Sequence, residues 1–209
     1  MELEGRRRGG LRLPGRARRG RQPVAGPGEP GATPPAARAA FEIRRARPGD
    51  LDTLVELYAG VAAEGRWIAA EAPVDRAMRR RRMSELLDRP DGAMFVAEAE
   101  GKLVGQLGME LARYGVADLG MLVVAGWRGR GVGSALVAAG LAWAREAGAH
   151  KVALQVWPHN QAAVALYEKF GFQREGLLRH HYRRRNGELW DAVVMGLLLD
   201  GPMQAGEDR

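Results

Sequence analysis

A glycine-rich turn between an apolar segment and a helical one limits the possible folds of this chain more than any other part of its sequence. The apolar residues Met121 to Ala125 lead into the run Trp127-Arg128-Gly129-Arg130-Gly131-Val132-Gly133-Ser134, and an alanine- and leucine-rich stretch follows. A strand that turns directly into a helix leaves backbone N–H groups unpaired at the start of the helix. The run therefore predicts a pyrophosphate site, to which Arg128 and Arg130 can add charge-assisted hydrogen bonds worth roughly 1.5–3 kcal/mol each.

Two common phosphate-binding motifs do not fit this run. The loop of nucleoside triphosphatases requires Gly-Lys before Ser or Thr, but Gly131 is followed by Val132 and Gly133, so the lysine is missing. A dinucleotide-binding turn requires a glycine where Ser134 stands. It also requires an acid at the end of the next strand, where this chain has Gln155. The remaining pattern is [QR]-x-x-G-x-G, which is met by Arg128, Gly131 and Gly133 and is typical of acyl-CoA pyrophosphate sites.

A second motif follows at residues 160–172, where the chain reads N-x-x-A-x-x-L-Y-x-K-x-G-F from Asn160 to Phe172. The two motifs, in this order and spacing, resemble those of GNAT-superfamily N-acetyltransferases, and the resemblance covers about residues 41–199. Within the superfamily the chain looks most like small bacterial acetyltransferases that act on amino acids or other small amines. The resemblance implies an α/β (α+β) fold with flanking helices and a mixed, mostly antiparallel sheet, whose central parallel strands splay around acyl-CoA.

Composition divides the chain into an N-terminal extension, a domain and a short tail. Residues 1–40 contain nine arginines against three glutamates and so carry +6 of the formal charge of +7. They are rich in Gly and Pro and have no aromatic residue before Phe41. Such a segment cannot bury enough apolar area to offset its ordering entropy. We expect disorder in residues 1–40, an acetyltransferase domain at 41–200 and a C-terminal tail at 201–209.

The arginine-rich extension leaves several partners open. Arginines can neutralise nucleic-acid phosphates. A solvated low-complexity segment or a transit peptide could also have this composition. The same is true of extra sequence translated from an upstream start codon and not used by the folded domain. A nucleic-acid partner is therefore not the expectation. The chain has no secretory or transmembrane apolar run, no Cys for disulfides or thiol catalysis, and four scattered His without metal-binding spacing. These features favour a cytoplasmic enzyme without a metal or a membrane partner, and the resemblance implies that its co-substrate is acetyl-CoA.

Periodicity predicts the order of secondary structure in the domain. We expect the parallel pair where the strand before the glycine-rich turn meets the strand after its helix, because a crossover helix joins parallel strands. Asp50 is a candidate N-cap of the first helix, and the last two strands should form a hairpin at the far edge, with exposed edges that would allow a homodimer. The expected strands are 41–46, 93–98, 103–111, 116–125, 151–156, 172–177 and 190–199, and the expected helices are 51–63, 74–87, 132–147 and 160–170.

Acyl transfer to an amine needs a held donor, a polarised carbonyl, a neutral amine and a proton for the leaving thiolate. Backbone N–H groups of residues 128–134 would hold the donor. The resemblance assigns the main-chain N–H of Val123 to the carbonyl, Asn160 to the pantetheine arm and the Tyr167 hydroxyl to the thiolate. Each also has a structural interpretation: Val123 and Tyr167 as core residues, and Asn160 as a helix N-cap.

The general base is where the chain departs from part of the family. Protein N-terminal acetyltransferases of the ribosomal-protein type carry Glu at the position of Gln155, and an amide cannot take the proton. Deprotonation at pH 7 costs roughly 4–5 kcal/mol for a lysine amine but about 1 kcal/mol for a peptide α-amine, which a water relay could serve. Asp118 is the first alternative base or acid, ahead of Glu110, Glu64 and His159.

The acceptor should lie between the loop Glu64 to Ile68 and the last hairpin around Arg179 to Tyr182, which are variable walls in the resembling family. Glu64 could bind a substrate ammonium and Arg66 a carboxylate. His180 and His181 are expected in a solvated loop. The sequence thus predicts acetyl transfer from acetyl-CoA to an amino acid or small amine by direct attack. The alternatives are a protein N-terminal acetyltransferase, and a non-catalytic acyl-CoA-binding or nucleic-acid-associated protein.

Overall fold

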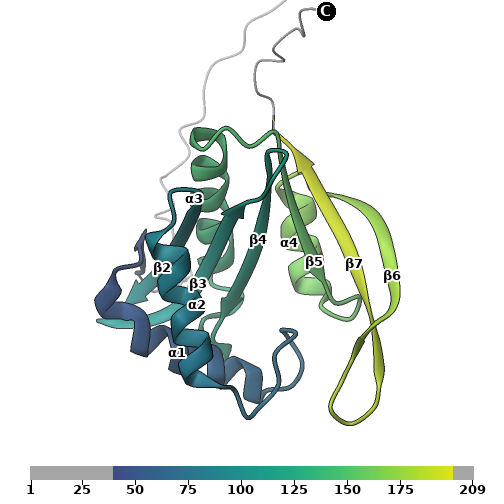
Figure 1. The fold of residues 1–209 in the computed structure, drawn as a ribbon, viewed down its shortest axis with the longest axis horizontal. Helices are drawn as coiled ribbons and strands as arrows, with labels where there is room; N and C mark the ends of the chain where they lie inside the picture. Colours follow the sequence, from purple (N-terminus) through teal and green to yellow (C-terminus); the bar gives the residue numbers. More distant parts are fainter. Residues whose placement is uncertain (1–39, 200–209) are drawn as a thin grey trace, which may run out of the picture. The chain divides into compact units, whose positions relative to one another are not determined.

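The computed structural model describes residues 40–199 (Figure 1). The predictions for residues 1–39 and for the tail 201–209 therefore lie outside the described residues. Two one-turn 3₁₀ helices, Pro48–Asp50 and Ala125–Trp127, lie between the main elements. The main elements are β1 (Glu42–Arg45), α1 (Leu51–Ala63), α2 (Arg76–Asp88), β2 (Gly92–Ala99), β3 (Lys102–Leu111), β4 (Val116–Val123), α3 (Val132–Glu146), β5 (Lys151–Val156), α4 (Gln161–Lys169), β6 (Gln173–Arg183) and β7 (Leu189–Leu198).

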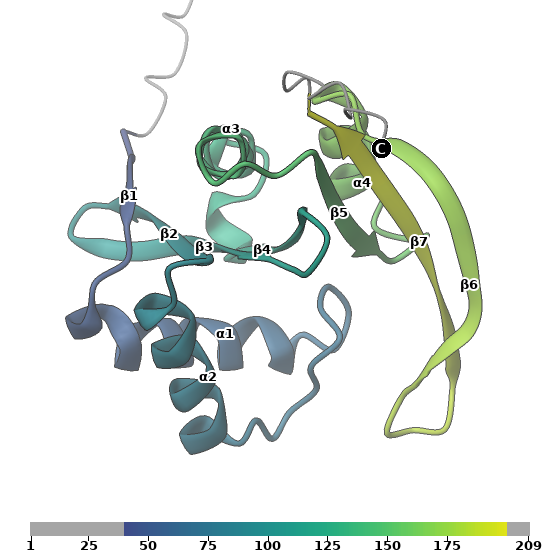
Figure 2. The same cartoon turned by 45° about the horizontal axis from the view of Figure 1, so that its top comes forward.

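The strands form one mixed sheet in the order β1-β2-β3-β4-β5-β7-β6. Every neighbouring pair is antiparallel except β4 and β5, which are parallel. Figure 2 shows α1 and α2 on one face of the sheet and α3 on the other. This arrangement confirms the predicted fold class, including the central parallel pair and the terminal hairpin of β6 and β7.

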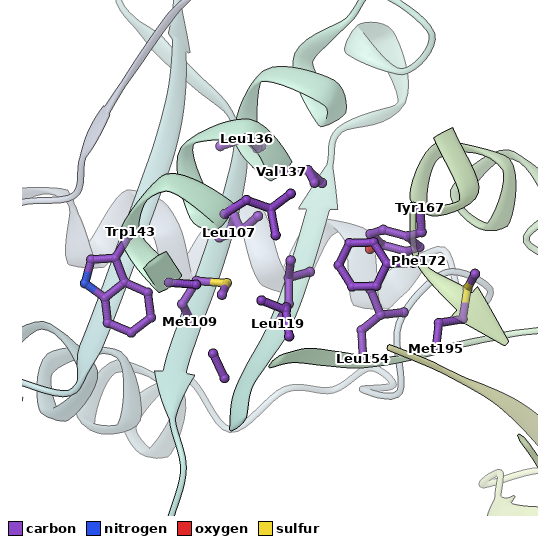
Figure 3. Packing of buried hydrophobic residues seen from close by; sticks show 14 of the residues in the cluster. Leu107, Met109, Leu119, Leu136, Val137, Trp143, Leu154, Tyr167, Phe172 and Met195 are labelled. Carbon is purple, nitrogen blue, oxygen red and sulfur yellow. The ribbon is translucent and has the colours of Figure 1, made fainter. Parts of the chain in front are cut away.

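The helix after the glycine-rich turn packs closely on the middle of the sheet. Leu136 and Val137 of α3 are fully buried against Leu107 of β3, and Figure 3 shows them in one cluster with Tyr167 and other residues near β5. A Cβ atom at Gly140 would lie 2.9 Å from Leu107 Cδ2, so the missing side chain allows this approach. The start of α3 is thereby fixed beside the end of β4.

The parallel strands pair over a short stretch only. Val116 to Asp118 of β4 lie opposite Lys151 to Ala153 of β5, and no further register positions follow within the described residues. Figure 1 shows the two strands diverging beyond this point. The sheet is therefore forked at its centre, and the fork opens toward the C-terminal ends of both strands, next to the start of α3. We call this opening the wedge.

Three local details differ from the predictions. His180 and His181 lie within β6 and not in a loop, because β6 continues to Arg183 past an irregular stretch in which His180 has φ +51°. Asp50 occupies the N-cap position of α1, as predicted, but its side chain makes no capping hydrogen bond. Its carboxylate accepts hydrogen bonds from the Arg44 guanidinium and the Arg47 N–H instead.

The third correction concerns the start of the second helix, which is α2. It begins at Arg76 and not near Val74, because the Asp75 carboxylate caps the Met78 N–H at 2.9 Å. Within residues 40–199, none of the helices combines the length and the apolar character that crossing a bilayer would require.

Candidate active site at the forked sheet

The start of α3 presents unpaired backbone donors. Gly131 is the N-cap with φ +92°, and the Ala135 N–H donates to the Gly131 carbonyl at 3.1 Å. The N–H groups of Val132, Gly133 and Ser134 precede this bond and have no partner inside the helix. These three amides, with the helix dipole behind them, are the donors at which the sequence predicts an anion, and that role stays a prediction.

Glycines shape this turn for two different reasons. Gly129 and Gly131 adopt left-handed backbone conformations, at φ +73° and +92°, although a Cβ atom at either would meet nothing within 4 Å. At Gly133 the reason is space, because a Cβ would lie 3.0 Å from Leu166 Cδ2 of α4. Gly133 thus lets α3, α4 and β4 converge beside the wedge. The guanidinium of Arg130 lies over the Trp127 ring, 5.2 Å from its centroid.

The backbone of Val123 faces the wedge. Val124 donates its N–H to the Val104 carbonyl at 3.0 Å, and Val123 is the register partner of Gly105. Hydrogen-bonded and non-hydrogen-bonded pairs alternate along an antiparallel ladder, so the N–H and C=O of Val123 point away from β3. They point toward β5, which no longer pairs with β4 at this level. The Val123 N–H is therefore a backbone donor available to a group held in the wedge.

The side chain of Arg128 is bound to protein partners. Its Nε donates to the Val123 carbonyl at 2.8 Å, and its two terminal nitrogens each bind the Glu64 carboxylate at 2.7 Å. Trp67 Nε1 also donates to Glu64, at 2.6 Å. The Arg128 hydrogen bond is the main cause that lowers the pKa of the Glu64 carboxyl. The structure thus joins Glu64 and Arg128, to which the sequence assigns separate roles in acceptor and cofactor binding.

Two residues of the second motif, Asn160 and Tyr167, lie at the start of α4 and within it. Asn160 is its N-cap, and its Oδ1 accepts the Ala163 N–H at 3.3 Å. Tyr167 is buried, and its ring packs on Phe172 with centroids 5.6 Å apart (Figure 3). Burial raises the pKa of the Tyr167 hydroxyl well above its ordinary value. A phenol at its ordinary pKa already keeps its proton at neutral pH, so the raised pKa leaves the Tyr167 hydroxyl a hydrogen-bond donor and makes it a weaker acid.

Asp118 lies away from these groups. It is five residues before Val123 on the same strand, a separation of about 16 Å at the usual strand rise. Its register partner is Glu110, which forms an ion pair with Arg89 at 2.6 Å. Burial, and then the charge of Glu110, raise the pKa of Asp118. Asp118 and Glu110 are therefore distant along the strand from the Val123 amide, and the role of Asp118 as a base or acid stays a prediction.

The loop between α1 and α2 is fastened to the hairpin of β6 and β7. Arg184 is 3% exposed, donates to the carbonyls of Ala69 and Gly65 at 3.0 and 3.3 Å, and lies 3.4 Å from the Glu71 carboxylate. Arg185 Nη1 donates to the Ala72 carbonyl at 2.7 Å. Sequence reasoning missed Arg184, because in the run Arg183 to Arg185 it has no local signal that separates it from its exposed neighbours.

An aromatic cluster lies where β5 ends, between the turn after this strand and the hairpin of β6 and β7. Trp157 follows β5 and contacts Tyr182 and Trp190 edge to face, with centroids 4.8 and 5.4 Å apart. The Tyr182 hydroxyl donates to Gln155 Oε1 at 2.8 Å. His159 stacks on Trp157, and its Nε2 lies 3.0 Å from the Arg66 carbonyl. The side chains of this cluster come from β5, from the turn after it, and from β6 and β7. Within residues 40–199, no cluster of His, Asp or Glu has the arrangement of a metal site.

Comparisons with known proteins agree with this geometry. The model of the acetyltransferase (GNAT) family matches residues 61–172. The L-amino acid N-acetyltransferase AaaT of Escherichia coli (strain K12) is 32% identical over 161 residues, which cover 73% of this chain and 94% of that protein.

Two solved structures share the fold. The ribosomal-protein-alanine N-acetyltransferase of Brucella melitensis aligns with a TM-score of 0.70 at 28% identity, over 76% of this chain and 99% of that one. The yncA protein of Salmonella typhimurium, solved with its cofactor acetyl-CoA, aligns with a TM-score of 0.68 at 23% identity, over 81% and 98% of the two chains.

Proposed function

Because this chain belongs to the GNAT family and is an acetyl-CoA-dependent N-acetyltransferase, we propose that its acceptor is the primary amine of a free amino acid or another small amine. We further propose that transfer is direct, without a covalent enzyme intermediate. The observation that carries this mechanism is the wedge, where the Val123 N–H and the unpaired amides of α3 border one opening.

The backbone of the glycine-rich turn fits the pyrophosphate of acetyl-CoA. The amides of Val132, Gly133 and Ser134 would bind it, aided by Arg130, whereas the Arg128 side chain fixes the end of β4 through the Val123 carbonyl. The Val123 N–H would then donate to the thioester oxygen as that oxygen gains negative charge. An oxyanion donor of this kind is typically worth about 3–4 kcal/mol of transition-state stabilisation.

Tyr167 would complete the transfer. The acceptor nitrogen attacks the thioester carbon, a C–N bond forms, and the C–S bond breaks with its electrons on sulfur. A thiolate needs a proton donor, and the Tyr167 phenol, which is protonated at neutral pH, would supply one. Asn160, beside the same helix, would contact the pantetheine arm in addition to capping α4.

Two observations support a small acceptor. The relative from Escherichia coli is named for L-amino acids, and the two walls of the acceptor side are joined by Arg184 and Arg185, which suits a small molecule better than a polypeptide. Glu64 accepts from three N–H donors of Arg128 and Trp67, and a carboxylate has about four acceptor positions, so one remains for an ammonium. Arg66 would bind the carboxylate of an amino acid.

A protein N-terminus is the second candidate acceptor. Similarity to the Brucella melitensis enzyme supports it, and so does the lower cost of deprotonating a peptide α-amine, about 1 kcal/mol at pH 7. Gln155 stands against it, because the ribosomal-protein type carries a glutamate at that position. The acetyl-transfer assay described next distinguishes the two candidate acceptors.

The test is acetyl-CoA-dependent release of free thiol by the full chain, measured against L-amino acids, polyamines, aminoglycosides and N-terminal peptides. We expect saturable activity with one or more free amino acids or small amines. Activity confined to the peptides would replace the proposal with N-terminal acetylation. Binding of acetyl-CoA without transfer to any of these acceptors would contradict both.

A further inference from the structure

His159 lies in the turn after β5, beside the wedge, and the proposed mechanism gives it no role. It sits in the turn between Val156, the last residue of β5, and Asn160, the cap of α4. The turn follows the part of β5 that has separated from β4, and the His159 side chain is exposed there. It is therefore accessible to a molecule that enters from the acceptor side.

The hydrogen bond of His159 fixes which ring nitrogen can take a proton. Its Nε2 is 3.0 Å from the carbonyl oxygen of Arg66, and a carbonyl only accepts. Nε2 therefore carries the hydrogen, and in the neutral ring Nδ1 carries the lone pair. A backbone partner that orients an imidazole in this way leaves the opposite nitrogen as a base.

Two tryptophans hold the ring. His159 stacks on Trp157 at an interplanar angle of 15°, with centroids 6.5 Å apart, and it meets Trp190 edge to face at 4.9 Å. These contacts and the bond to Arg66 come from three different parts of the chain. The imidazole is therefore held in one orientation, as a residue that must meet a reacting atom would be.

The loop that orients His159 also reaches the Val123 side of the wedge. Arg66 is flanked in sequence by Gly65 and Trp67, and Trp67 and Glu64 form the network with Arg128, which in turn binds the Val123 carbonyl. Residues 64–67 thus link the end of β4 to the turn after β5. This loop therefore contacts both Arg128, which binds the Val123 carbonyl, and His159.

We propose that His159 is the general base, with Nδ1 removing a proton from the acceptor ammonium; this role rests on the proposed function. The nitrogen loses two protons in all. The first goes to His159 and then to solvent, and the second returns to the Tyr167 oxygen after that phenol has given its own proton to the leaving sulfur. Gln155, four residues earlier, cannot perform the first transfer because an amide has no basic nitrogen.

Several charged and titratable groups surround His159. The guanidinium of Arg184 lies over Trp190 and Trp157, at 4.3 and 5.8 Å from their centroids, and Arg66 lies over Trp67 at 4.9 Å. Glu188 accepts from Trp190 Nε1 at 3.0 Å, and the Tyr182 hydroxyl contacts Gln155 on the same side. These are the groups that face the His159 ring from the loop after α1 and from the hairpin of β6 and β7.

The test is the variant His159→Gln in the full chain. Glutamine is chosen because its side-chain amide can still donate to the Arg66 carbonyl but cannot take a proton. With the amino acid that the wild type uses best, we expect kcat to fall about 100-fold while the Kd for acetyl-CoA is unchanged. The acid limb of the wild-type pH profile of kcat/KM should disappear. His159→Asn is a second variant, and His150→Gln, at an exposed histidine before β5, is the matched control.

The outcomes separate the base from its alternatives. Wild-type kcat and an unchanged acid limb in His159→Gln would overturn the role of His159 and leave the proposed function intact. A rise in KM alone would identify His159 as an acceptor-positioning residue and would also overturn it. A wild type that acetylates none of the L-amino acids would remove the proposed acceptor and this role together.

Discussion

Glu64 and Arg128 are 64 positions apart in the sequence, yet their ion pair sets the shape of the candidate site. The sequence predicts both residues as functional, from their types and from the glycine-rich motif, but it gives them separate partners. No local sequence pattern predicts the ion pair between them, because it depends on how α1 packs on the sheet. Backbone donors are the opposite case: the motif alone predicts the amides of α3, because glycine spacing fixes the local backbone.

The first prediction at the scale of residues concerns Tyr167. Tyr167→Phe should lower kcat by about 100-fold or more, because it removes the proton donor for the thiolate. Acetyl-CoA affinity should not change, since the ring and its packing on Phe172 remain. Steady-state kinetics and calorimetry test this. Since burial raises the Tyr167 pKa, any loss of wild-type activity that this group causes should come only at strongly alkaline pH. A variant with normal kcat would show that Tyr167 is a core residue only.

The second prediction is that Glu64 and Arg128 act as a unit. In a double-mutant cycle with Glu64→Ala and Arg128→Ala, the effects on kcat/KM should be coupled by about 0.5–3 kcal/mol, because either change frees the end of β4. The control is the pair of Glu56 and Arg76, which joins α1 to α2 with both side chains more than half exposed. That pair should leave activity unchanged. Additive effects at Glu64 and Arg128 would contradict the idea that one positions the other.

At the scale of elements, much could be predicted from the sequence, and the exceptions have physical causes. Helix α1 spans the predicted residues 51–63, because its apolar periodicity is strong and a turn precedes it. The prediction for β6 stopped at Leu177, whereas the strand continues to Arg183. Its second half follows the irregularity at His180 and is largely exposed, so it has no hydrophobic alternation. The burial of Arg184 could not be predicted from the sequence either, since it depends on backbone carbonyls more than 100 residues away in the chain.

The start of α3 gives a test of the anion site. Gly131→Ala places a Cβ in a left-handed conformation, which costs about 1–2 kcal/mol or distorts the turn. Acetyl-CoA affinity, measured by calorimetry, should fall. Gly126→Ala is the control, because Gly126 has neither a positive φ nor a neighbour within 4 Å of a Cβ atom. Equal affinities in the two variants would argue that the turn does not hold the ligand.

The junction of β1 and α1 gives a prediction about pH. Asp50 binds Arg44, whose hydrogen bond is the main cause that lowers the Asp50 pKa. A carboxyl with a lowered pKa stabilises the fold above its unfolded pKa, near 3.9, and the effect is lost as the pH falls through the folded value. Asp50→Asn should therefore reduce the free energy of unfolding by about 1–3 kcal/mol at pH 7.

Urea unfolding of wild type and Asp50→Asn at several pH values tests this. The difference should be constant at neutral pH and should shrink below about pH 4. Asp52→Asn serves as the control, because the Asp52 carboxylate is 84% exposed in its pair with Arg80. A difference between wild type and Asp50→Asn that stays the same in acid would rule out the charged carboxylate as its source.

At the scale of the whole molecule, two sets of strands meet at a narrow junction. Three residue pairs join β4 to β5, whereas β3 and β4 pair over seven. Beyond Asp118, the two sides of the sheet are held by α3, by α4 and by the loop that Glu64 and Arg184 fasten. Beyond Asp118, contacts between side chains therefore replace the backbone hydrogen bonds that would join β4 to β5 in a continuous sheet.

This narrow junction should be visible in the exchange of backbone amides with deuterium. The N–H groups of Met121 and Val123 point toward the separated β5, whereas the Val124 N–H is bonded to β3. Protection should therefore alternate along β4, with fast exchange at 121 and 123 and slow exchange at 124. Acetyl-CoA should slow the Val123 amide and leave Val124 unchanged, and uniform protection without the ligand would contradict the assignment. In this molecule, the substrate itself would supply the partner that the centre of the sheet lacks.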